Sequence, residues 1–183
     1  MTGFLRRTLR WINARPTRLR DPGAVFSQRR EELEQVLHDG PALRASSLAL
    51  ELALISMSAN DPSLRARIDT AQTGVQQMLD ELRNLGERLY PPVLRSSGIE
   101  SAVRTVAEKQ RVLLTLDVLS GESDLITQSR ACLLIADHLR SLRPGTAATV
   151  KVRGSRKFVR VSITHQVQDQ PEPKRHWAVI RCG

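Results

Sequence analysis

Aromatic side chains are scarce in this sequence. The 183 residues contain three phenylalanines, two tryptophans and one tyrosine, although hydrophobic residues make up 40% of the composition. That hydrophobic content is enough to build a buried core. With so few rings the core must consist of leucine, isoleucine, valine and alanine, a composition typical of helical bundles.

Cysteine and long apolar runs are also nearly absent. The two cysteines, Cys132 and Cys182, stand far apart without further ligand pairs near them, so no zinc site is expected from them. No apolar run approaches the ~18 residues of a membrane-spanning helix, and the N-terminal segment lacks the features of a secretory signal. We therefore expect a cytoplasmic protein with ordinary reduced thiols.

Acidic residues are missing from residues 1–20. This segment holds six arginines, which leaves only +3 of the net charge of +9 for the rest of the chain. The six are Arg6, Arg7, Arg10, Arg15, Arg18 and Arg20. We interpret the segment as a poorly ordered basic leader, with contact to an anionic membrane surface or to nucleic acid as alternatives. No recognised nucleic-acid-reading motif follows it.

Two long helices are predicted after this leader, over residues 24–57 and 63–89. The short polar link offers Asp61 as a cap and Pro62 as a first helical residue, so the helices should form an antiparallel hairpin. The second helix carries an apolar seam at alternating steps of four and three: Leu64, Ile68, Ala71, Val75, Met78, Leu82, Leu85 and Leu89. One hairpin cannot bury such a heptad seam, so we expect a homodimer with a four-helix bundle.

A histidine beside an acid lies part-way along the first of these helices, in the sequence Leu37-His38-Asp39-Gly40-Pro41. Imidazole is largely neutral near pH 7 and is nucleophilic. Asp39 can accept a hydrogen bond from one ring nitrogen and leave the other free to attack. Pro41 disrupts the helix, so either the helix is split here or His38 sits at a flexible point. The pair is a candidate phosphoryl acceptor, and an inert pair on a helix surface is the alternative.

Residues 93–183 are predicted to form a small α+β domain. The patterns indicate helices over 97–110 and 129–142, strands over 112–118, 149–153 and 158–164, and a short last strand over 176–180. His138, His165 and His176 fall in this domain. None has a neighbour at metal-ligand spacing, so they are interpreted as ordinary residues and no metal is expected.

With these motifs in place, the chain resembles the cytoplasmic core of bacterial sensor histidine kinases, of the nitrate-sensor and DesK-like subclass. The resemblance covers residues 27–118 and rests on Leu37-His38-Asp39-Gly40 and Leu89-Tyr90-Pro91-Pro92-Val93-Leu94. It implies a mostly α then α+β fold, with a hairpin that forms a dimeric four-helix bundle and a small ATPase-like α/β sandwich. It also implies that His38 is the phosphoacceptor, that Asp39 orients or deprotonates it, and that a response regulator receiver domain is the partner.

The sequence departs from this family in its dephosphorylation and ATP motifs. Leu43 stands five residues after His38, where the subclass commonly has an amide, so phosphatase activity is not expected. The family's ATP site has a Glu followed four residues later by a magnesium-binding Asn, whereas here Asp137 is followed by Ser141. Asp169 is not followed by the family's glycines. We expect a degenerate ATPase domain without a bound cofactor, and ATP with Mg²⁺ only if that domain still binds them.

These observations predict a basic tail over residues 1–22, a phosphoacceptor hairpin over 23–92 and a degenerate ATPase-like domain over 93–183. The expected function is that of an incomplete, histidine-kinase-like phosphotransfer dimer in a two-component system, with intrinsic autokinase activity lost. His38 would pass phosphate to a response regulator or the chain would dock one, and a full-length histidine kinase is a further partner. A non-catalytic adaptor or pseudokinase dimer and an active sensor kinase are the alternatives.

Overall fold

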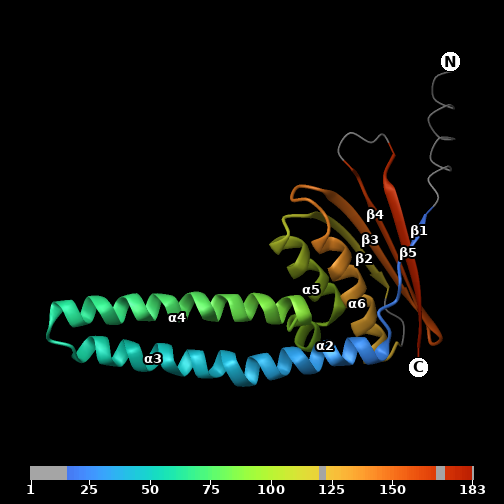
Figure 1. The fold of residues 1–183 in the computed structure, drawn as a ribbon. Helices are drawn as coiled ribbons and strands as arrows, with labels where there is room; N and C mark the ends of the chain where they lie inside the picture. Colours follow the sequence, from blue (N-terminus) through green and yellow to red (C-terminus); the bar gives the residue numbers. More distant parts are fainter. Residues whose placement is uncertain (1–15, 120–122, 168–171, 183) are drawn as a thin grey trace, which may run out of the picture. The chain divides into compact units, whose positions relative to one another are not determined.

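The computed structural model describes residues 16–119, 123–167 and 172–182 (Figure 1). The chain divides into two compact units, a hairpin unit of residues 28–91 and a sheet unit of residues 1–27 with 92–183. The elements in chain order are β1 (Thr17–Arg18), α2 (Ala24–Leu37), the π-helical turn η2 (His38–Ala42), α3 (Leu43–Ser58), α4 (Pro62–Leu89), α5 (Val93–Lys109), β2 (Leu113–Leu119), α6 (Leu125–Arg140), β3 (Ala147–Gly154), β4 (Phe158–His165) and β5 (Lys174–Arg181).

The hairpin unit contains the two long helical segments that the sequence predicts, running antiparallel with α3 against α4 (Figure 1). Asp61 caps α4 by accepting a hydrogen bond from a backbone N–H of its first turn, and Pro62 is its first residue, as predicted. At the other end of α4, the guanidinium of Arg30 donates a hydrogen bond to the carbonyl oxygen of Leu89 (2.7 Å). Both ends of the hairpin are thus fixed by polar contacts.

The predicted heptad seam of α4 divides into two sets. Ile68 is buried, and Val75, Leu82 and Leu89 are half-buried. The alternate seam positions, Leu64, Ala71, Met78 and Leu85, are exposed. Leu79 and Gly86 lie outside the predicted seam but are buried. A single hairpin therefore packs about half of the seam and leaves a heptad-spaced apolar set uncovered.

The sheet unit is a five-stranded mixed sheet with strand order β1-β5-β4-β3-β2. β3, β4 and β5 are antiparallel to one another, while the edge strands β1 and β2 pair in parallel with β5 and β3. α5 and α6 cover one face of the sheet (Figure 1). Aliphatic side chains fill the space between them, as the shortage of aromatics predicts; the largest fully buried ones are Leu133, Ile135, Leu139, Ile163 and Ile180.

No helix among the described residues is both long and apolar enough to cross a membrane. The cytoplasmic location stays a prediction.

Residues Thr17–Arg18 form a short strand that the sequence did not reveal. This strand pairs with β5, and the Arg18 guanidinium lies 5.5 Å from the centre of the Trp177 ring. A cation over an indole face is attracted by the ring quadrupole, so Arg18 belongs to the fold of the sheet unit. Four of the six arginines of the predicted basic tail lie within residues 1–15, outside the described residues.

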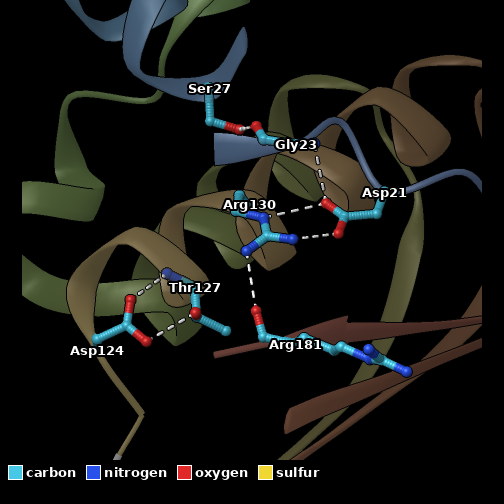
Figure 2. A network of polar contacts seen from close by, with 7 residues as sticks. All are labelled: Asp21, Gly23, Ser27, Asp124, Thr127, Arg130 and Arg181. Atoms are coloured by element: carbon cyan, nitrogen blue, oxygen red, sulfur yellow. Dashed lines mark hydrogen bonds and ion pairs between the residues drawn. The ribbon is translucent and has the colours of Figure 1, made fainter. Parts of the chain in front are cut away.

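Arg130 of α6 joins three segments of the sheet unit (Figure 2). Its guanidinium makes an ion pair with Asp21 and donates a hydrogen bond to the Arg181 carbonyl oxygen of β5 (2.9 Å). Burial by itself raises the pKa of Asp21. Hydrogen bonds from Arg130 and from the Gly23 N–H outweigh burial and hold that pKa below its ordinary value. The part-buried pair therefore holds the segment before α2 against α6 and β5.

Replacing Arg130 with leucine should lower the free energy of unfolding of the sheet unit by about 1–3 kcal/mol at pH 7, because two acceptors lose their donor. The pKa of Asp21 is lowered in the folded state, so the share that comes from the Asp21 pair is fully present above the ordinary aspartate pKa and is lost as pH falls through the lowered pKa. Urea unfolding followed by tryptophan fluorescence in a Trp11→Phe background measures it, because Trp177 is then the single tryptophan and the hairpin unit has none.

The matched control is Arg104→Leu, which removes an exposed pair with Glu100 on α5. Exposed pairs on one helix contribute about 0.5 kcal/mol or less, so this variant should unfold nearly as the parent does. If Arg130→Leu and Arg104→Leu lowered the free energy of unfolding by the same small amount, the role given to Arg130 would be contradicted.

Candidate functional site

His38 begins a π-helical turn that interrupts an otherwise α-helical path. In an α-helix Pro41 would lack the N–H needed to bond the carbonyl of Leu37, and its ring would clash with that carbonyl. A π-turn widens the helix and accommodates this residue. Leu37 and Leu43, which flank the turn, both have α-helical dihedrals (φ −66°, ψ −41° and φ −64°, ψ −43°). Of the two predicted outcomes, the helix is not split, and it widens where His38 lies.

The side chains of His38 and Asp39 contact each other on this turn. His38 Nδ1 lies 2.9 Å from Asp39 Oδ1, and the two side chains are 76% and 66% exposed. An ionised carboxylate can only accept hydrogen bonds, so Nδ1 carries the proton in this contact. In the neutral ring, Nε2 then carries the lone pair. This is the hydrogen bond that the sequence analysis expected of the pair.

The surroundings of the pair are open. A Cβ atom added to Gly40 would meet no atom within 4 Å, and no residue of η2 is buried. Leu43, which occupies the position where the subclass commonly has an amide, is the exposed first residue of α3. Another protein can therefore approach the ring without displacing a side chain of the hairpin.

The positions matched to the family's ATP motif lie at the end of α6 and have other partners. Asp137 accepts a hydrogen bond from Arg140 one turn later (3.1 Å). Ser141 follows the last residue of the helix, and its hydroxyl donates to the carbonyl oxygen of His138 (2.6 Å). Asp169 lies outside the described residues. A hydroxyl committed to a helix end is a poor substitute for an asparagine that binds magnesium.

Three histidines that the sequence analysis treated separately come together in the sheet unit. They are His138 of α6, His165 at the end of β4 and His176 of β5, and one ligand atom from each lies within 4.8 Å of the others. Burial is the main reason why the pKa of each of the three rings lies below its ordinary value. The pKa of His138 is lowered to about 4. His165 and His176 continue the alternating inward positions of their strands, which was a usable signal. The strand register that brings them together could not be read from the sequence.

Comparisons with known proteins agree with the hairpin geometry. Residues 29–94 match the family described as Histidine kinase, and no curated protein matches the chain. A histidine kinase from Burkholderia phymatum STM815 is structurally similar with a TM-score of 0.32 and 18% identity, over 80% of this chain and 72% of that one. The Erythrobacter litoralis EL346 blue-light activated histidine kinase gives a TM-score of 0.31 and 13% identity, over 73% of this chain and 46% of that one.

Both TM-scores are low, so neither structural likeness assigns a function by itself. The family match has more weight because it spans His38, Asp39 and both long helical segments of the hairpin. Residues 29–94 therefore match the histidine kinase family, as the resemblance in the sequence predicts.

Proposed function

We propose that His38 is a phosphoacceptor and that Asp39 orients and deprotonates it, in a dimer that relays phosphate to a response regulator. The observation that carries this proposal is the 2.9 Å contact between Nδ1 and the Asp39 carboxylate on a ring that is 76% exposed. The contact leaves Nε2 as the nucleophile and places a base at the other nitrogen. The pair lies on a π-helical turn, and such turns are frequent at functional sites.

The transfer step follows from this arrangement. The Nε2 lone pair attacks the phosphorus of the donor, an N–P bond forms, and the bond from phosphorus to the leaving oxygen breaks. The ring becomes positively charged as the bond forms, and the Nδ1 proton can pass to Asp39 Oδ1. Passing phosphate to a receiver aspartate reverses these steps. Asp39 therefore stabilises the charged ring in both directions.

We also propose that the phosphate comes from another kinase. Asp137 is engaged with Arg140, and Ser141 caps α6, so neither side chain supports a magnesium-bound nucleotide in the way the family's Glu and Asn do. The sheet unit is then a degenerate ATPase-like domain. A full-length histidine kinase would supply the phosphoryl group.

A homodimer is supported by the uncovered apolar residues of the hairpin. Leu48 and Ile55 share one exposed face of α3, and Ala71, Met78 and Leu85 share one exposed face of α4. Viewed along each helix axis from its N-terminus, this exposed face is rotated by about 70°, in the same sense in both helices, from the face that packs within the hairpin. The helices are antiparallel, so the same rotation directs both faces to one side of the hairpin. A second hairpin on that side would complete a four-helix bundle.

A different apolar row on α3 supports receiver docking. Leu43, Leu50, Leu54 and Met57 are exposed on the face turned away from α4. The row starts five residues after His38, so a receiver domain bound to it would bring its aspartate toward the exposed ring. Apolar patches of this kind mark protein interaction sites. Docking on this row without phosphate is what the adaptor alternative predicts.

Phosphorylation of the purified protein and of His38→Ala tests this function. Each is incubated with labelled ATP and Mg²⁺, alone and with a catalytically competent histidine kinase. We expect acid-labile label on the parent protein only when the kinase is added, and none on His38→Ala. Label on the parent protein alone would contradict the donor claim. Absence of label under both conditions would contradict the phosphoacceptor and favour the adaptor.

A further inference from the structure

The three clustered histidines come from three elements of the sheet unit that the fold holds together. On β4, Val159, Val161, Ile163 and His165 alternate inward, and on β5 His176 shares its face with the buried Ala178 and Ile180. Ile163 is paired with His176 in the antiparallel register, so His165 and His176 are diagonal neighbours on one face. α6 packs on β4 and β5 and adds His138 to them. The cluster therefore depends on tertiary structure.

The ring nitrogens have the spacing of metal ligands. His138 Nε2 lies 3.3 Å from His165 Nδ1, and the ligand atoms of all three residues lie within 4.8 Å of one another. Two nitrogens bound at ~2.0–2.1 Å to one tetrahedral zinc ion are themselves about 3.3–3.4 Å apart. One pair thus already has the required separation. The third ring, His176, would have to turn toward the same centre.

His176 supplies an independent observation that points to a ligand. Neither its Nδ1 nor its Nε2 is exposed to solvent, and neither has a hydrogen-bond partner among the described residues. Buried polar atoms in native proteins nearly always have a partner, and an orphaned one calls for an ion, a water molecule or another bound group. The ring is parallel to that of His165, with centroids 5.2 Å apart, and its centroid is 4.4 Å from that of His138.

The chemistry of the cluster selects the class of ion. Among the described residues it consists of imidazoles alone, which suit Zn²⁺, Cu²⁺ and Ni²⁺, whereas Mg²⁺ and Ca²⁺ prefer oxygen ligands. Burial lowers the pKa of each ring, so the rings are neutral at pH 7 and their lone pairs are available. Lys174, which is paired with His165 in the strand register, is the positive charge that opposes a cation here.

We propose that His138, His165 and His176 form a binding site for a divalent transition-metal ion of the zinc class. Three protein ligands leave the fourth tetrahedral position open to water or to a small anion. The ion would join α6 to β4 and β5 and stabilise the sheet unit. This proposal does not depend on phosphate transfer by His38, which lies in the other unit.

The test uses the full chain without an affinity tag, and the chain offers its own matched control because it contains four histidines. Zn²⁺ is titrated against a chromophoric chelator with the parent protein and with His138→Gln, His176→Gln and His38→Gln. We expect one Zn²⁺ per chain. Changes outside the first ligand shell already cost 10–100-fold in affinity, so loss of a ligand should weaken binding by about 100-fold or more. His38→Gln should bind as the parent does.

Co²⁺ substitution of the parent protein gives a second readout that does not need a folded variant. Intense visible absorption bands, typical of tetrahedral cobalt, are expected and should disappear when Zn²⁺ is added. Zn²⁺ should also raise the melting temperature that tryptophan fluorescence reports in a Trp11→Phe background, because it binds only the folded unit. No saturable Zn²⁺ binding, unchanged affinity in His138→Gln and His176→Gln, or the weak spectrum of octahedral cobalt would each overturn the proposal.

Discussion

Replacing Asp39 with asparagine is expected to slow phosphoryl transfer to His38 by about 10²–10⁴-fold, the range typical of general acid–base catalysis. The amide oxygen can still accept the Nδ1 hydrogen bond and hold the ring. It cannot take the proton or offset the positive charge that develops when Nε2 bonds to phosphorus. The initial rate at which label passes to His38 from labelled ATP bound by the added donor kinase measures the effect.

Asp80→Asn is the control for this prediction. It makes the same change on an exposed carboxylate of α4, which is paired only weakly with Arg83 (3.5 Å). Its transfer rate should match that of the parent protein. Transfer by Asp39→Asn within twofold of the parent rate would show that the 2.9 Å contact of Asp39 with His38 has no catalytic role.

Replacing Met78 with glutamate is expected to separate the proposed homodimer into monomers. Met78 lies in the exposed heptad-spaced set of α4, which a second hairpin would bury. Each copy would lose about 1.5–3 kcal/mol of apolar burial and would have to desolvate a charge. Two copies per dimer therefore raise the dissociation constant by about 100-fold or more. Sedimentation equilibrium or light scattering over a concentration series measures it.

The neighbouring change Gln77→Glu is the control, because it adds the same charge to α4 without changing the apolar face that the second hairpin would bury. Gln77 is exposed on the face of α4 opposite the one that packs in the hairpin, so a glutamate there should leave the dissociation constant nearly unchanged. A parent protein that is monomeric at all concentrations, or a Met78→Glu variant that dimerises as the parent does, would contradict the four-helix bundle.

Local signals in the sequence predicted the hairpin well. Asp61 and Pro62 are a cap and a first helical residue that depend only on their immediate neighbours, and both take these roles. The alternating strands β3 and β4 were also readable. The resemblance to histidine kinases that began with Leu37-His38-Asp39-Gly40 is confirmed by the family match over residues 29–94, while the subclass and the degenerate ATPase domain stay predictions.

Features that depend on long-range packing were not readable. The π-turn relieves the clash between Pro41 and the carbonyl of Leu37. The sequence predicts that Pro41 disturbs the helix, but it does not show that the helix widens into a π-turn. β1 has only two residues, and contacts with distant parts of the chain hold it in place. Arg18 contacts Trp177 and Asp21 pairs with Arg130, and both partners are more than 100 residues away in the chain. The histidine cluster needs both the β4–β5 register and the placement of α6.

The most direct measurement of the central claim is nitrogen-15 NMR of the imidazole ring of His38 before and after phosphorylation by a donor kinase. We expect that Nδ1 carries the proton in the unmodified neutral ring, and that Asp39→Asn weakens this preference. We also expect that phosphate is then attached to Nε2. Phosphate on Nδ1, or a neutral ring protonated on Nε2, would contradict the role of Asp39 and with it the proposed mechanism.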